Sequence, residues 1–361
     1  MDSAFIPSLM RWYAEMAAAL PWRASTDPYR VWLSEIMLQQ TQVTTVIPYY
    51  ERFTAVFPTV GALAVADQDT VLKLWEGLGY YSRARNMHLA AKTVVEKHGG
   101  QFPTTVDELV TLPGIGRYTA GAIASIAFGE PTPVLDGNVI RVFSRLFDID
   151  EDVTQSSVQN RLWKQAEQLV PAANPGDYNQ ALMELGRTIC KPRSPLCGKC
   201  PVHDFCLAYQ RGVQEGRPVK KKKAPTPHYD VTAGLIRNEL NELLIAKRPD
   251  DKLLGGLWEF PGGKLDGNET LPECLQRELQ EELGIQIEVG PFFVKVRHAY
   301  THFKITLHVF ECRYLPEGGA PQALQCADWR WVEEADLGRY AFSAADRQVI
   351  EALNQRSHML F

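Results

Sequence analysis

Apolar side chains recur every three or four positions through the first 207 residues, which is the spacing of amphipathic helices. Trp32, Ile36 and Met37 follow this pattern. The longest apolar stretch, residues 120–128, has the length of one buried helix and falls far short of the roughly 20 residues that cross a bilayer. The pattern predicts a mostly helical domain over residues 1–207 and no membrane contact.

The composition changes after Cys206. Gly, Pro and Lys dominate residues 208–228, which predicts a basic, semi-extended linker. Its lysine run, Lys220–Lys223, fits a solvated linker and a contact with a DNA backbone equally well. From residue 229 to residue 361 the pattern predicts an α+β domain. Its expected strands are residues 231–236, 243–246, 294–298, 305–310 and 329–332, and its expected helices are residues 272–283 and 344–355.

Basic and acidic residues are divided unevenly between these regions. Residues 1–227 carry 24 Lys and Arg against 22 Asp and Glu, whereas residues 228–361 carry 14 against 21. The first region is nearly neutral, so any contact with nucleic-acid phosphates has to come from local basic clusters. The second region is acidic, which favours a different role.

Four of the seven cysteines fall within 17 residues, with the spacing C-x6-C-x2-C-x5-C. Because the first residues lack the pattern of a secretion signal, the cluster favours metal ligation over disulfides. Four thiolates on one loop bind either a zinc ion or a [4Fe–4S] cluster, and the spacing alone leaves both open. The candidate ligands, on the loop 190–206, are Cys190, Cys197, Cys200 and Cys206. The loop also carries three candidates for phosphate contact, Lys191, Arg193 and Lys199.

Residues 112–120, LPGIGRYTA, have the signature of a helix-hairpin-helix motif, which is expected at about 108–128. Gly114 and Gly116 let the backbone approach a phosphate, and the next helix begins with free N–H groups. About 20 residues later, VLDGNV places Asp136 before an apolar helical pattern. An aspartate there suits a helix N-cap, and a catalytic role is compatible with that position.

Glu35 stands in an otherwise apolar helical segment, residues 32–43. A glutamate in a helix is most often a surface residue, but burial would raise its pKa and suit it to general acid catalysis. This segment, with LPWR at residues 20–23, resembles the adenine glycosylases that remove adenine opposite 8-oxoguanine. The hairpin, the NQAL segment at residues 179–182 and the cysteine loop resemble the wider endonuclease III superfamily of DNA glycosylases.

The resemblance implies a [4Fe–4S] cluster rather than zinc, and a catalytic pair in which Glu35 protonates N7 of adenine and Asp136 stabilises the sugar cation. It assigns supporting roles at the catalytic site to Tyr118 and Asn138. It also implies that the target base leaves the duplex, with Arg23, Leu38 and Gln180 lining its pocket and Gln40 and Tyr80 wedging into the DNA.

Position 118 separates two classes within this superfamily. Relatives that also cut the strand carry a lysine there, which forms a Schiff base with C1′. Tyr118 cannot form one, so the sequence predicts base removal without efficient strand cleavage. Ile140, where some members of the family carry lysine, favours the same interpretation.

Residues 263–285 fit the Nudix box at every fixed position. Glu278, Glu281 and Glu282 are expected on one helix face, where Mg²⁺ or Mn²⁺ would relieve their repulsion. In the family that the chain resembles, the C-terminal Nudix-like domain recognises 8-oxoguanine and its box is commonly degenerate. The intact box leaves nucleotide hydrolysis open beside recognition. Tyr300, Thr301 and His302 match the family's aromatic-Ser-His loop for 8-oxoguanine, with threonine in place of serine.

The resemblance therefore predicts a monofunctional glycosylase that excises adenine opposite 8-oxoguanine or guanine in double-stranded DNA. It is expected to act as a monomer in the cytoplasm, associated with the nucleoid of a bacterial-type cell. Two alternatives remain at this point: a glycosylase/lyase of the endonuclease III type, and a Nudix pyrophosphatase with a DNA-binding module.

Overall fold

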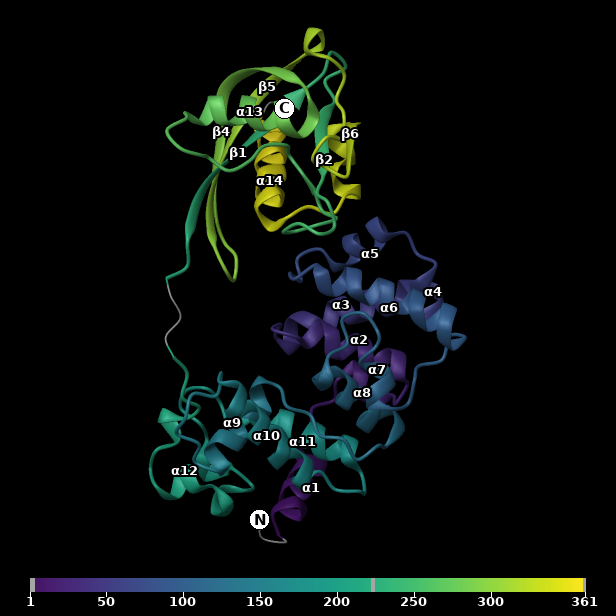
Figure 1. Ribbon diagram of the computed structural model, residues 1–361, viewed down its shortest axis with the longest axis vertical. Coiled ribbons are helices and arrows are strands. Elements are labelled where there is room, and N and C mark those ends of the chain that lie inside the picture. The colour runs from purple at the N-terminus through teal and green to yellow at the C-terminus, as the bar shows by residue number, and fades with distance from the viewer. Residues whose placement is uncertain (1–3, 222–224, 360–361) are drawn as a thin grey trace. The chain divides into compact units, whose positions relative to one another are not determined.

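The computed structural model describes residues 4–221 and 225–359. Within these ranges it forms two compact units (Figure 1). Of the described residues, the first comprises 4–65 and 86–221, and the second comprises 66–85 and 225–359. The predicted combination of a helical domain and a C-terminal α+β domain is present, but residues 66–85 group with the second unit.

The first unit is built from helices, as predicted. They are α1 (Phe5–Met16), α2 (Pro28–Leu38), α3 (Val43–Val56), α4 (Val60–Ala64), most of α6 (Ser82–His98), α7 (Val106–Leu109), α8 (Arg117–Phe128), α9 (Gly137–Leu146), α10 (Ser156–Leu169), α11 (Pro175–Thr188) and α12 (Leu207–Gln210). Short 3₁₀ segments lie at Pro21–Ala24 (η1), Cys197–Lys199, His203–Phe205 and Gln214–Gly216.

Local signals define the ends of the helices that matter most for the site. The side chain of Asp27 accepts the N–H of Arg30 and caps α2, with Pro28 at its first position. α8 ends at Gly129, whose left-handed backbone (φ 71°) stops the helix. Apolar faces of α1, α8, α9, α10 and α11 meet in one buried core that includes Leu9, Phe143 and Leu182. This core fixes α8, α9 and α11 relative to one another.

The described part of the predicted linker is packed rather than extended. Ala208 is buried, and Val213 packs against the core of the first unit. Arg217 bonds to Asp148 at 2.9 Å, and the N–H of Val153 donates to Val219 O at 3.1 Å. These contacts tie residues 208–221 of the predicted linker to the helical unit. Lys222 and Lys223 lie outside the described residues.

The second unit contains a six-stranded mixed sheet with the order β3-β2-β1-β5-β4, in which β6 also pairs with β2. Its strands are β1 (His228–Arg237), β2 (Leu243–Lys247), β3 (Trp258–Glu259), β4 (Gln286–Ala299), β5 (Lys304–Leu315) and β6 (Asp328–Val332). β1 and β5 are parallel, and the other pairs are antiparallel. The helices are α5 (Gln68–Trp75), α13 (Leu271–Leu283) and α14 (Ala344–Met359).

The sheet is covered on both faces. Leu275, Leu279 and Leu283 of α13 join one buried cluster, and Val349 and Leu353 of α14 join the other. The α+β prediction is confirmed in this layered arrangement.

β4 is longer than predicted. Gly290 and Pro291 interrupt the alternation of apolar and polar residues that marks a strand, and the pairing of β4 with β5 is irregular between Val289 and Val294. The pattern therefore revealed only the second half of this strand.

Residues 66–85 join the second unit through specific polar contacts. Lys247 forms an ion pair with Asp69. The Lys73 ammonium donates to Tyr340 O at 2.9 Å, and the N–H of Phe342 donates to Glu76 Oε1 at 2.8 Å. These partners are more than 170 residues apart in the chain, so local sequence patterns could not indicate them.

Candidate active site

A cavity of about 740 Å³ lies in the helical unit. η1, α2, α8, α9 and α11 all contribute to its wall. Eight of the predicted site residues line it: Arg23, Glu35, Leu38, Gln40, Tyr118, Asp136, Asn138 and Gln180. Residues that are up to 157 positions apart in the sequence are thus brought to one hollow large enough for a purine base.

Glu35 is buried on α2, with 6% of its surface exposed. Burial raises the pKa of this carboxyl group to about 7, and the hydrogen bond from Tyr118 only partly opposes the rise. The Tyr118 hydroxyl donates to Glu35 Oε2 and also lies 3.3 Å from Met183 Sδ. The structure therefore places a carboxyl group that holds a proton near neutral pH at the cavity wall.

Asp136 is the N-cap of α9. Its Oδ1 accepts the N–H groups of Asn138 and Val139 at 3.0 and 2.8 Å, and its Oδ2 accepts the Asn138 side-chain amide at 2.8 Å. Burial raises the pKa of Asp136, and these N–H donors act against the rise because they stabilise the carboxylate. The cap interpretation is correct, and the same side chain lines the cavity.

Two charged residues of the cavity were missed by sequence reasoning, Glu184 and Arg187. Both lie on α11, and Glu184 follows Gln180 by one helical turn, so the two share a face. That spacing was the only signal that could have indicated Glu184 once Gln180 had been chosen.

The glycines of the hairpin permit its backbone conformation. Gly114 has a φ of 75°, and a Cβ there would stand 2.7 Å from Asn86 Cβ. Gly116 is the N-cap of the 12-residue helix α8, with no side-chain cap, and a Cβ there would meet nothing within 4 Å. The beginning of α8 is therefore open to an approaching anion.

The cysteine loop surrounds a buried arginine. Arg145 of α9 is 1% exposed and donates to Cys190 Sγ at 3.3 Å and to the carbonyl of Lys191 at 2.7 Å. The Cys206 thiol lies 3.4 Å from Arg145 O. An arginine bonded to a ligand sulfur fits thiolate ligation, because the guanidinium stabilises negative charge on the sulfur. The donor set of four thiols on one loop fits an iron–sulfur cluster. The basic residues of the loop, Lys191, Arg193 and Lys199, are exposed.

In the second unit the predicted wedge residue contacts the predicted 8-oxoguanine loop. The Tyr80 hydroxyl lies 2.6 Å from the Thr301 hydroxyl. Tyr80 has a φ of 50°, a left-handed backbone that is uncommon for a tyrosine. Tyr300 stacks on Phe303 at 4.7 Å between ring centres, and His302 is exposed beside them. Gln40, the other predicted wedge residue, has a φ of 58° in the first unit.

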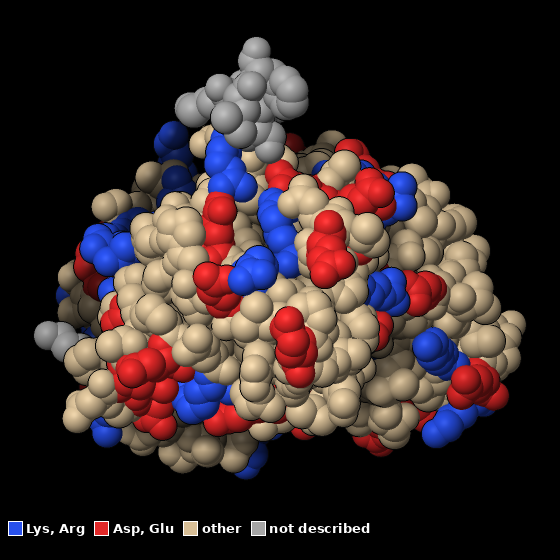
Figure 2. All heavy atoms as spheres, turned by 90° about the horizontal axis from the view of Figure 1, so that it is seen from above, with Lys and Arg blue, Asp and Glu red and all other residues tan. Residues whose placement is uncertain are grey.

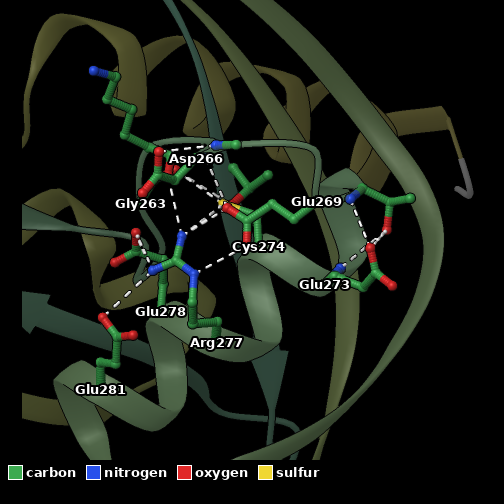
Figure 3. A network of polar contacts seen from close by, with 12 residues as sticks. Gly263, Asp266, Glu269, Glu273, Cys274, Arg277, Glu278 and Glu281 are labelled. Carbon is green, nitrogen blue, oxygen red and sulfur yellow. Dashed lines mark hydrogen bonds and ion pairs between the residues drawn. The ribbon is translucent and has the colours of Figure 1, made fainter.

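The Nudix helix α13 carries its own cation. The Arg277 guanidinium bonds to Glu269 at 2.8 Å, Glu278 at 3.0 Å and Glu281 at 3.4 Å (Figure 3). Glu282 is separate: burial and the nearby Glu259 raise its pKa to about 8. The magnesium site at Glu278, Glu281 and Glu282 stays a prediction; in this arrangement Arg277 bonds to two of the three carboxylates.

Comparisons with known proteins bear on every part of the chain. Residues 33–168 match the HhH-GPD superfamily of base excision DNA repair proteins, residues 190–206 match the iron-sulfur binding domain of endonuclease III, and residues 232–352 match the NUDIX domain. The adenine DNA glycosylase of Homo sapiens is 39% identical over 96% of this chain and 73% of its own length. That of Schizosaccharomyces pombe is 32% identical over 92% of this chain and 86% of its own length. The chain belongs to the adenine DNA glycosylase family.

Bacterial adenine DNA glycosylases are also similar to this chain. The enzyme of Buchnera aphidicola subsp. Baizongia pistaciae is 42% identical over 71% of this chain and 73% of its own length. Members of this family hydrolyse the bond between adenine and its sugar in mispaired DNA, so the predicted family, enzyme class and repair function are confirmed. The match of Cys190–Cys206 to the iron–sulfur domain confirms the predicted [4Fe–4S] cofactor.

Solved structures agree with the glycosylase fold. A thermostable thymine-DNA glycosylase has a TM-score of 0.52 and 29% identity, covering 58% of this chain and 96% of that one. A non-covalent endonuclease III–DNA complex has a TM-score of 0.50 at 23% identity, which supports the fold alone. Adenine glycosylases match the chain across both domains. The two alternatives, an endonuclease III-type glycosylase/lyase and a Nudix pyrophosphatase, are therefore not supported.

Two further expectations concern the surface. Among the described residues, no helix has the length and apolar character to cross a membrane. On the face shown in Figure 2, basic and acidic side chains are intermixed and neither sign forms a broad area. On that face the mixture offers no broad basic area for nucleic-acid phosphates.

Proposed function

We propose that this adenine glycosylase excises adenine opposite 8-oxoguanine or guanine, with Glu35 as the acid and Asp136 as the stabilising carboxylate, and that it leaves the DNA strand intact. The observation that carries the proposal is the pairing of two carboxyl groups with different environments in one cavity. Glu35 is buried against a hydroxyl, whereas Asp136 is bonded by three N–H donors.

The first step uses the proton on Glu35. Adenine leaves as an anion only with difficulty, so a proton delivered to N7 weakens the bond between N9 and C1′. A pKa of about 7 leaves a large share of Glu35 protonated at neutral pH, which suits a general acid. Tyr118 holds the carboxyl in place through its hydroxyl.

The second step uses the charge on Asp136. As the C1′–N9 bond breaks, its electron pair goes to adenine and positive charge develops on the sugar. The carboxylate of Asp136, which accepts the N–H groups of Asn138 and Val139, stabilises that charge. Water then adds to C1′, and its proton returns to Glu35, which restores the acid.

The absence of a lysine nucleophile supports base removal without strand cleavage. The charged groups that line the cavity are Arg23, Glu35, Asp136, Glu184 and Arg187, and no lysine is found among the described lining residues. A guanidinium cannot form a Schiff base with C1′ under these conditions, because it stays protonated. Water is therefore the nucleophile that remains.

Recognition of the opposite base is proposed for the second unit. Tyr80 and Thr301 share a hydrogen bond, so the wedge and the 8-oxoguanine loop form one surface within that unit. Tyr300 and His302 belong to the same loop. The hydroxyl of Thr301 provides the hydrogen-bonding group that serine supplies in relatives.

Binding of the strand is proposed for the hairpin. The open N-terminus of α8 at Gly116 and the close backbone at Gly114 suit a phosphate of double-stranded DNA. The [4Fe–4S] cluster, held by the four cysteines, supplies structural cross-linking of the loop and takes no part in the chemistry. A chromosomal substrate would place the protein, as a monomer, in the compartment that holds the DNA, the nucleoid in a bacterial cell.

The test is adenine release from duplexes that carry A opposite 8-oxoguanine, guanine or thymine. We expect alkali-labile sites at adenine in the first two duplexes only, and no strand breaks before alkali treatment. Glu35→Gln and Asp136→Asn should each slow release by about 10²-fold or more, whereas Glu151→Gln, in an exposed ion pair with Arg161, should not change it. Release opposite thymine at a comparable rate, or a wild-type rate in Glu35→Gln, would overturn the proposal.

A further inference from the structure

A buried carboxylate with two arginine partners forms part of the wall of the active-site cavity. Glu184 on α11 is 2% exposed. Its Oε2 accepts Arg23 Nη2 at 2.9 Å and Arg187 Nε at 3.2 Å, and its Oε1 is bonded by Arg187 Nη2. Both oxygens of Glu184 are therefore used in ion pairs at the wall.

Arg23 is held from several sides. Besides Glu184, its Nη1 donates to Ala18 O at 3.1 Å, and its guanidinium lies 5.5 Å from the centre of the Tyr13 ring. A buried ion-pair network contributes less to stability than well-packed apolar side chains of similar size. Its position at a catalytic cavity therefore points to a role in the reaction rather than in folding.

The charges around Glu35 come from four directions. Tyr118 lies on α8, Asp136 at the start of α9, Arg23 on η1, and Glu184 with Arg187 on α11. α3, which also packs against α2, contributes to the described cavity wall only Val43 and Thr44.

These charges balance only when Glu35 is neutral. Apart from Glu35, the wall carries two positive groups, Arg23 and Arg187, and two negative groups, Asp136 and Glu184. Arg23 is the cation that acts on Glu35 directly, and it favours the ionised carboxylate, which lowers the pKa of Glu35. An arginine already paired with a carboxylate exerts a weaker field on a third group than an unpaired one.

We propose that Glu184 is a positioning residue that keeps Arg23 paired at the wall, so that Glu35 enters the reaction as an acid. The inference rests on the proposed role of Glu35. Without the carboxylate at position 184, the wall holds one surplus positive charge, and Arg23 is no longer fixed by it. Both changes favour ionised Glu35, which cannot protonate adenine.

The experiment is the single-turnover rate of adenine release from A:8-oxoguanine duplex between pH 5 and pH 9. Activity of the wild type should fall as the pH rises through the pKa of Glu35. In Glu184→Gln, the midpoint of this fall should move to lower pH by on the order of one unit, the usual effect of one buried charge on a neighbouring group. Glu184→Asp, which keeps the charge, should stay near the wild-type midpoint.

Arg187→Gln supplies a second test that does not depend on the folding of Glu184→Gln. Arg187 is 37% exposed, so its loss should be tolerated. Removal of its positive charge should move the midpoint to higher pH, the opposite direction, by a few tenths of a unit because solvent screens it. The double variant Arg23→Gln, Glu184→Gln, in which the wall is balanced again, should return the midpoint toward the wild-type value.

The outcomes separate the two proposals. A wild-type profile without a fall at high pH would overturn the role of Glu35 as acid. A wild-type fall that stays at the same pH in both Glu184→Gln and Arg187→Gln would overturn the role of Glu184 alone, even if the rates drop equally at every pH. Visible absorbance of the iron–sulfur cluster in each variant confirms that the helical unit is folded.

Discussion

Replacement of Glu35 by glutamine should make the protein more stable at alkaline pH while it slows catalysis. The pKa of Glu35 rises from an ordinary value of 4.5 to about 7 in the folded protein, mainly because the group is buried. Below pH 4.5 the carboxyl is protonated in both states, and the folded state carries no penalty. As the pH rises from 4.5 to about 7, the unfolded state ionises while the buried carboxyl stays protonated, so stability is lost, and above pH 7 the loss is complete.

The size of this effect follows from the two values. A difference of about 2.5 pH units corresponds to about 3 kcal/mol, at about 1.36 kcal/mol per unit. Glutamine has nearly the same shape, has no charge and still accepts the Tyr118 hydroxyl. The variant should exceed the wild type by less than about 1 kcal/mol at pH 5 and by about 3 kcal/mol at pH 8.

Urea unfolding of the full-length protein, followed by circular dichroism at pH 5, 6, 7 and 8, measures the difference directly. Adenine release, measured in parallel, should fall about 10²–10⁴-fold, the usual contribution of a general acid. Glu151→Gln is the matched control: its carboxyl is exposed, and both stability and activity should stay close to the wild type. A stability gain of equal size at pH 5 and pH 8 would refute the reasoning, since it would show that ionisation of Glu35 is not the cause.

Three further substitutions or assays test other parts of the molecule. Tyr118→Lys should place an amine in the cavity and produce a borohydride-trappable complex with strand nicking on a gel; the lack of both would place this residue away from C1′. Tyr80→Phe removes the hydrogen bond to the Thr301 hydroxyl, which contributes about 1 kcal/mol. In competition assays the preference for A:8-oxoguanine over A:G should fall about fivefold. An unchanged preference would show that this contact does not serve recognition. With 8-oxo-dGTP and Mg²⁺, the wild type should release no more pyrophosphate than Glu281→Gln, because Arg277 forms ion pairs with Glu278 and Glu281 of the box. Wild-type turnover that Glu281→Gln abolishes would contradict this expectation.

The parts of the active site that lie within motifs could be predicted from the sequence. Glu35, Tyr118 and Asp136 are about 100 residues apart at their extremes, yet each stands in a segment whose local pattern is distinctive. Their convergence in one cavity was implied only by the family resemblance. The burial of Glu35, on which its acidity depends, became visible only when α8, α3 and η1 were packed against α2.

Contacts between distant, ordinary residues could not be predicted. In the sequence, Glu184 resembles a surface glutamate of an amphipathic helix, because the residues next to it do not indicate that Arg23 is its partner. Asp69 and Lys247 are likewise unremarkable in sequence, although their ion pair helps to bring residues 66–85 into the second unit. Single charges have no periodicity, so only tertiary packing reveals which of them are partners.

The N-cap role of Asp136 has a practical consequence for capturing the enzyme on DNA. Asparagine is as good an N-cap as aspartate, since its side-chain oxygen accepts the same N–H groups of Asn138 and Val139. Asp136→Asn therefore removes the negative charge at the sugar but keeps the start of α9 in place. Such a variant would hold an uncleaved adenine nucleotide long enough for crystallography. The surface that binds the DNA would be the same as in the wild type.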